Sequence, residues 1–208
     1  MVKGQNPVYS ANVIEFVAAA NEFCKYAEHA SEIKGDELLK ILQRLLPFLY
    51  IKASLLPVLE PVFEDGNQKV VTEADWDRVH EAFRKQFGSA DDYLELSDKK
   101  INETEDIVPS GISEDMADIY QDLKDFLIPY QTGTDEVMND ALWECRMNFE
   151  NIWGQKLVNS MKAIHRYIYS GEEPGPVENI EKVKDLERDT SDWFISKRQR
   201  EFRKDGKQ

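Results

Sequence analysis

The residues from Thr134 to Ser170 form the stretch that most constrains this chain. They have helical periodicity over about 36 residues, which corresponds to roughly 54 Å at 1.5 Å per residue. Apolar side chains recur at steps of three and four residues and define one face: Leu142, Cys145, Phe149, Trp153, Leu157, Met161, Ile164 and Ile168. A helix this long needs several others packed along it. The sequence therefore predicts an all-α bundle around one uninterrupted long helix, at about residues 135–170.

Four shorter helices are expected before the long one. Their predicted caps are Ser10 or Asn12, then Asp36, then Thr72, then Ser113. Thr72 has Asp75 three residues later, as in a capping box, and this third helix is expected to stop at Gly88. The second helix, which is expected to extend to about residue 59, is apolar almost all round. It is predicted to be buried on most sides and to be kinked or split at Pro47.

Two segments lack this periodicity. Residues 89–111 are acidic and unperiodic, and we expect them to form a long loop. Residues 171–178 contain the sequence GEEPGP, which is typical of a linker. The expected organisation is an all-helical domain at residues 1–170, a linker at 171–178 and a helical or disordered tail at 179–208.

Composition excludes several classes of function. The chain of 208 residues has a formal net charge of −14, which disfavours binding to nucleic acid and to anionic membranes. Cys24 and Cys145 lie in apolar helical patterns, so both are expected to be free, buried thiols. The N-terminus lacks the apolar core of a signal peptide, and no apolar run is long enough to span a bilayer. A cytoplasmic location follows as the expectation.

Carboxylates are the most distinctive polar feature. Asp115, Asp118, Asp122 and Asp125 recur at steps of three and four, so they form one stripe on the predicted fourth helix. One interpretation is a solvated face whose charges pair with lysine or arginine elsewhere in the chain. The other is a divalent cation site, since magnesium and manganese bind clustered oxygen ligands.

A second polar strip follows the long helix: Asp140, Glu144, Asn148, Asn151, Gln155 and Asn159. Asparagine is a poor helix former, so these amides are expected to bond a neighbouring helix, the acidic loop or a ligand. If both strips face each other, six carboxylates enter one cleft, namely Asp115, Asp118, Asp122, Asp125, Asp140 and Glu144. Helix bundles build metal sites in this way, so these six are the predicted metal ligands. No catalytic or cofactor-binding residue is predicted.

Several segments also resemble a known family. NPVYSANVIEFV, LLPFLYIKASLLP, ISEDMADIYQDLKDF and NDALWECRMNFENIWGQKLVNSMKAIH are similar to bacterial proteins grouped as domain-of-unknown-function family 5063. The resemblance spans about residues 6–170 and implies an uncharacterised all-helical protein of about 200 residues. It brings no activity with it.

A second resemblance is mechanistic. Ser113-Glu-Asp-Met-Ala-Asp118 is similar to a helix of the all-α nucleotide pyrophosphohydrolases, where acidic residues bind magnesium; Asp115 and Asp118 match those positions. Those enzymes also carry Glu-x-x-Glu on an earlier helix, and here Glu28 and Glu32 are four apart. Two hypotheses follow. The favoured one is a non-enzymatic helical domain acting through protein-protein contacts; the alternative is a Mg- or Mn-dependent nucleotide phosphohydrolase.

Overall fold

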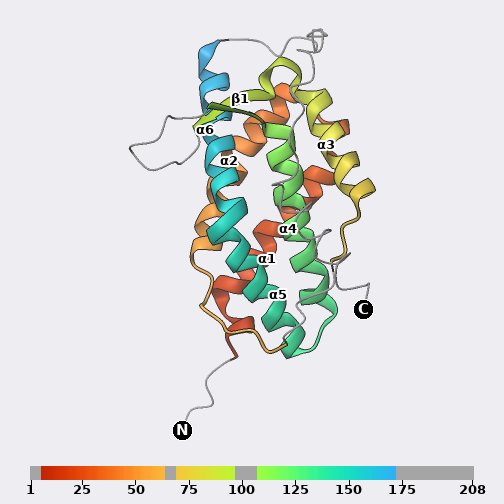
Figure 1. Cartoon of the computed structure of the whole chain (residues 1–208), viewed down its shortest axis with the longest axis vertical. Helices are drawn as coiled ribbons and strands as arrows, with labels where there is room; N and C mark the ends of the chain where they lie inside the picture. Colours follow the sequence, from red (N-terminus) through yellow and green to blue (C-terminus); the bar gives the residue numbers. More distant parts are fainter. Residues whose placement is uncertain (1–5, 64–68, 97–106, 172–208) are drawn as a thin grey trace, which may run out of the picture. The chain divides into compact units, whose positions relative to one another are not determined.

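The computed structural model describes residues 6–63, 69–96 and 107–171. In this part of the chain the helices and strands are α1 Ala11–Glu28, α2 Gly35–Ser54, α3 Glu73–Phe87, β1 Asp92–Leu96, β2 Ile107–Gly111, α4 Ile112–Thr132, α5 Asp135–Asn148 and α6 Gly154–Ser170 (Figure 1). The predicted all-α bundle is confirmed, with one small antiparallel hairpin added. The predicted linker at 171–178, apart from Gly171, and the tail at 179–208 lie outside the described residues.

Helix α4 is the best-connected element among the described residues. It packs against α1, α3, α5 and α6, while α2 packs against α1, α3 and α6. Figure 1 shows α4 beside α3 and α5 for much of its length. The bundle is therefore organised around α4 as well as around the long helical segment after residue 134.

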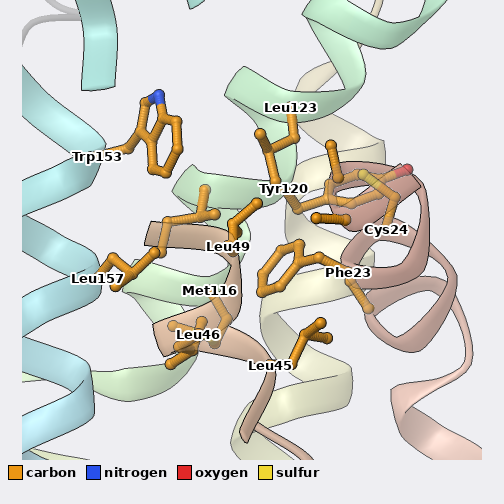
Figure 2. Packing of buried hydrophobic residues seen from close by; sticks show 14 of the residues in the cluster. Phe23, Cys24, Leu45, Leu46, Leu49, Met116, Tyr120, Leu123, Trp153 and Leu157 are labelled. Carbon is orange, nitrogen blue, oxygen red and sulfur yellow. The ribbon is translucent and has the colours of Figure 1, made fainter. Parts of the chain in front are cut away.

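The core collects apolar side chains from most of these helices. Figure 2 shows the meeting point of α1, α2, α4 and the long segment, and the labelled members are Phe23, Cys24, Leu45, Leu46, Leu49, Met116, Tyr120, Leu123, Trp153 and Leu157. Both cysteines are buried and free, as predicted. Burial in apolar surroundings raises the pKa of the Cys24 thiol to about 12, so this thiol is unreactive at neutral pH.

Two of the four predicted cap positions are confirmed. Ser10 occupies the N-cap of α1, and its side chain makes no capping hydrogen bond. The Thr72 hydroxyl accepts from the Asp75 backbone N–H at 3.2 Å, and the Asp75 carboxylate accepts from the Thr72 N–H, so the capping box at α3 is complete. Helix α3 ends at Gly88, whose φ of 53° favours glycine. The predictions for Asn12 and Asp36 are wrong. Asn12 donates to the Leu55 carbonyl at 3.2 Å, and Asp36 lies inside the first turn of α2, which begins at Gly35.

The acidic segment before α4 is not a simple loop. Residues Asp92–Leu96 and Ile107–Gly111 pair as an antiparallel hairpin, with Tyr93 opposite Ser110. Five-residue strands with a ten-residue connection carry little periodicity, which explains why the pattern missed them. The Ser113 cap is also wrong. Ser113 is buried within α4, and its backbone N–H and hydroxyl both donate to the Asp91 carboxylate at 2.7 Å.

Pro47 does not split the second helix. Helix α2 continues through this residue and ends at Ser54, earlier than the predicted end near residue 59. The prediction that this helix is buried on most sides is also wrong. The leucines within the helix face the core, but Phe48 and Ile51 are exposed, and so is Leu55 at the C-cap position directly after it.

The predicted uninterrupted helix at 135–170 contains a π-helical segment, Phe149–Trp153, between α5 and α6. The sequence pattern explains it. Apolar positions 145, 149, 153, 157 and 161 follow at four consecutive steps of four, which is longer than the 3.6-residue turn. A wider π turn absorbs the excess and keeps Cys145, Trp153 and Leu157 buried.

Candidate functional site

The four aspartates of α4 do not form a solvated face. Asp115 and Asp125 are buried, while Asp118 and Asp122 are half-buried. The stripe faces the rest of the protein, and the second strip on α5 lies close enough for Asn148 to bond Asp122. The two strips therefore face each other at this point. Each carboxylate of the stripe has a partner within the protein. We refer to the carboxylates of α4 and α5 together with these partners as the carboxylate seam.

Asp115 and Asp118 share one lysine. The Lys156 ammonium lies 2.8 Å from the Asp118 carboxylate and 3.4 Å from that of Asp115. Asp115 also accepts hydrogen bonds from the hydroxyls of Tyr93 and Ser160, both at 2.6 Å. Burial raises the pKa of Asp115 to about 6, and Lys156 and the two hydroxyls oppose that shift. The two carboxylates raise the pKa of Lys156, so this lysine stays charged.

Asp125 and Asp140 hold the connection between α2 and α3. The Asp125 Oδ1 accepts from the backbone N–H groups of Val70 and Val71 at 2.8 and 2.9 Å. Asp140 accepts from Val62 and Phe63, one at each oxygen, both at 2.7 Å. A connection without regular structure needs partners for its backbone groups, and these two aspartates supply them.

Other polar residues of α5 serve the same connection. Asn139 donates to the Glu60 carbonyl at 2.8 Å, and Arg146 donates to the Leu56 carbonyl. Lys69 lies between the two helices, 2.9 Å from Glu144 and 3.7 Å from Asp125. The polar face of α5 thus binds main chain rather than opening onto solvent.

Asp122 has the weakest set of partners in the stripe. Among the described residues its one hydrogen bond comes from the Asn148 amide, at 2.6 Å. Burial raises its pKa to about 7, with further increases from Asp118 and Asp125, and Lys69 and Asn148 oppose the shift. Asp122 is therefore partly protonated at neutral pH, unlike an ordinary aspartate.

Replacing Asp122 with asparagine is expected to stabilise the protein at alkaline pH. The pKa of Asp122 is higher in the folded protein than in the unfolded chain, where it is about 4. Protonated Asp122 therefore stabilises the folded state at pH values below about 4, and this contribution is lost as the pH rises through 7. Asparagine never ionises and can still accept from Asn148. The stability of the variant relative to wild type should therefore rise by about 2 kcal/mol between pH 5 and pH 8, measured by urea unfolding.

Asp118→Asn is the matched control, because Asp118 lies on the same stripe as Asp122 but has a lysine that compensates its charge. Asp118 accepts from the Trp76 indole at 2.7 Å and pairs with Lys156, so its charge is compensated. We expect this substitution to destabilise the protein by about 1–2 kcal/mol at pH 8. Equal pH dependence of wild type and Asp122→Asn would contradict the assignment.

The amides of the second strip divide into two groups. Asn148 and Asn159 bond across elements, to Asp122 and to Glu95, both at 2.6 Å. Asn151 donates to the Met147 carbonyl on its own helix, and Gln155 donates to Asn159. The expectation that these amides bond neighbouring helices or the acidic segment holds for the first group.

The described residues contain no group of three or more histidine, cysteine, aspartate or glutamate side chains placed to hold a metal ion. The magnesium or manganese site at Asp115, Asp118, Asp122, Asp125, Asp140 and Glu144 stays a prediction. Sequence reasoning missed Lys69 and Lys156, which lie beside these carboxylates. Both lysines come from segments whose position relative to α4 depends on tertiary packing, so no local pattern reveals them.

The outer face of α2 is a second candidate, of a different kind. Phe48, Ile51 and Leu55 are 46%, 55% and 48% exposed and recur at steps of three and four, so they share one face of the helix. Arg44 extends this face one turn toward the helix start, and it is exposed. Large apolar side chains gathered on a surface are typical of interaction sites. We refer to Arg44, Phe48, Ile51 and Leu55 as the α2 face.

These features define an all-α bundle protein whose aligned carboxylates bind side chains and backbone N–H groups of the same chain. The chain belongs to the family described as Domain of unknown function (DUF5063), whose model matches residues 7–170. The predicted resemblance to this family is confirmed. The chain is also similar to protein BF1032 from Bacteroides fragilis, known from a crystal structure. The two share 40% sequence identity over 80% of this chain and 98% of that one, with a TM-score of 0.72. No curated protein matches.

Proposed function

We propose that this protein is a non-enzymatic, cytoplasmic helical domain that acts through protein-protein contacts, and that the α2 face is its docking surface. The observation that carries the proposal is the exposure of Phe48, Ile51 and Leu55 on one side of a helix whose other side is core. A membrane is not the expected partner of this surface, because the net charge of −14 disfavours binding to anionic membranes. Among the described helices none is long and apolar enough to cross a bilayer.

The chemistry of the α2 face indicates the partner. Three apolar side chains at helical spacing match the apolar stripe of an amphipathic helix, which is a common recognition mode. Arg44 at one end favours an acidic residue on that partner. Lys52, whose ammonium lies 5.4 Å from the centre of the Phe48 ring, is already engaged, since it also lies 2.6 Å from the Glu15 carboxylate. The proposed partner is an amphipathic helix with an acidic end.

Site-specific crosslinking in cells tests the proposal. A photoreactive phenylalanine analogue at position 51 should yield one discrete crosslinked species, because Ile51 lies at the centre of the face. The same analogue at Glu22, which is exposed on α1, should yield none. Adding Leu55→Lys to the position-51 protein should abolish the product.

The stability of the substituted proteins provides the control for this experiment. Ile51→Glu and Leu55→Lys replace exposed side chains, so each should change the free energy of unfolding by less than about 1 kcal/mol. Equal products from positions 51 and 22, or a product that survives Leu55→Lys, would refute the docking surface.

A further inference from the structure

A cleft of about 510 Å³ lies between α6 and the start of the hairpin. One wall is a single face of α6, with lining positions between 155 and 170 at steps of three and four. The other wall runs from residue 89 to residue 95 and includes β1 up to Glu95. The volume lies within the range of small-molecule sites. Neither the carboxylate seam nor the α2 face includes it.

Hydrogen bonds fix the β1 wall of the cleft. The Tyr93 hydroxyl donates to the buried Asp115 carboxylate at 2.6 Å. Glu95 accepts at both oxygens, from Asn159 at 2.6 Å and from Ser110 at 3.2 Å. These bonds join the hairpin to α4 and α6, so the cleft is preformed rather than dependent on a ligand.

Two cations of α6 line the same cleft. Lys162 and Arg166 are one turn apart and exposed, and in the described part of the chain neither has an ion pair or a hydrogen bond. Lys156 on the same helix shows the contrast, since it pairs with both Asp115 and Asp118. Two cations without an ion-pair partner among the described residues are unexpected in a chain with 40 acidic and 26 basic residues.

Two carboxylates, Asp92 and Glu95, also line the cleft and keep their charges, but in the described part of the chain neither forms an ion pair with Lys162 or Arg166. Both Glu95 oxygens are occupied by hydrogen bonds from Asn159 and Ser110. Asp92 is exposed, and alternation along β1 places its side chain on the opposite face of the strand from Tyr93 and Glu95, at the rim of the cleft. An anion between Lys162 and Arg166 therefore contacts two cations that have no carboxylate partner among the described residues.

We propose that this cleft binds a small organic oxyanion, a carboxylate or a phosphate monoester. Arg166 is suited to two parallel hydrogen bonds with such a group, and Lys162 supplies a second charge. The aromatic ring of Tyr93 and the methyl group of Ala163 provide apolar contact for the rest of the ligand. This binding site is independent of the docking surface on α2.

Titration with phenyl phosphate and with benzoate tests the proposal, with benzyl alcohol as the neutral probe. Two-dimensional amide NMR of the full chain should show saturable shifts at residues 89–95 and 155–170 with at least one anion, and none with the alcohol. The stronger of the two anions distinguishes a phosphate site from a carboxylate site.

Charge-removing variants make the test specific. Lys162→Gln with Arg166→Gln should weaken binding at least tenfold and leave the unfolding midpoint unchanged, because both side chains are exposed. Lys25→Gln with Lys85→Gln removes the same charge from exposed positions on α1 and α3 and should leave binding unchanged. The proposal would be overturned if neither anion bound saturably. It would also be overturned if the shifts lay elsewhere in the protein, or if both double variants weakened binding equally.

Discussion

Replacing Gly154 with alanine is expected to lower the free energy of unfolding by about 3 kcal/mol, although alanine ordinarily stabilises a helix relative to glycine. Gly154 follows the π-helical segment, and an added Cβ would lie 2.3 Å from the Phe149 carbonyl oxygen and 2.9 Å from the Phe149 ring. That ring packs on Trp153 and Tyr50, with centroids 4.7 and 5.2 Å apart. Relieving the clash therefore disturbs the core.

Gly111→Ala is the matched control for this experiment. A Cβ at Gly111 meets its nearest atom, the Asp91 Oδ2, at an ordinary 3.5 Å, and its φ of −121° suits any residue. We expect a change of less than about 1 kcal/mol, measured by urea unfolding followed by circular dichroism. If Gly154→Ala proved stabilising, as in a regular helix, the π-helical segment would not be the native conformation.

The π-helical segment also shows how far the sequence determines this fold. The apolar face of the long segment was predicted correctly, because side-chain burial follows the periodicity of hydrophobic residues. The run of four-residue steps was present in the same pattern, yet its consequence depends on which core positions must stay buried together. Trp153, with no exposed surface, needs that wider turn to face the core.

The carboxylate seam was predictable in position but not in role. Spacing alone places the aspartates of α4 on one stripe. Their partners come from distant segments: Lys156 follows Asp118 by 38 positions, and Val70 precedes Asp125 by 55. Local patterns carry no information about such pairings, so a stripe used for internal hydrogen bonds looks the same in sequence as a metal site.

The hairpin and the α2 face were missed for different reasons. The strands are too short for alternation to appear, and Tyr93 and Glu95 face the protein while Leu94 is exposed, the reverse of the usual pattern. In α2 the apolar residues surround the helix, so periodicity cannot show which side lacks a neighbour. Only the positions of α1, α3 and α6 reveal that Ile51 and Leu55 stay exposed.

The two anchoring aspartates are expected to respond differently to asparagine, because their oxygens are used differently. At Asp125 a single oxygen, Oδ1, accepts both backbone N–H groups, from Val70 and Val71. Asparagine keeps that acceptor, so Asp125→Asn should cost less than about 1 kcal/mol. Alanine removes it and leaves two donors without a partner, so Asp125→Ala should cost about 3 kcal/mol.

At Asp140 each oxygen accepts one backbone N–H, from Val62 and from Phe63. Asparagine has one acceptor oxygen, so its amide nitrogen must face one of these donors. Asp140→Asn should therefore lower the free energy of unfolding by about 2 kcal/mol, nearly as much as Asp140→Ala. At position 125, in contrast, the loss with asparagine should be much smaller than the loss with alanine. Urea unfolding of the four variants at pH 7 measures both differences. The same asparagine penalty at both positions would contradict this account, because it would attribute the effect to lost charge rather than to the number of acceptor atoms.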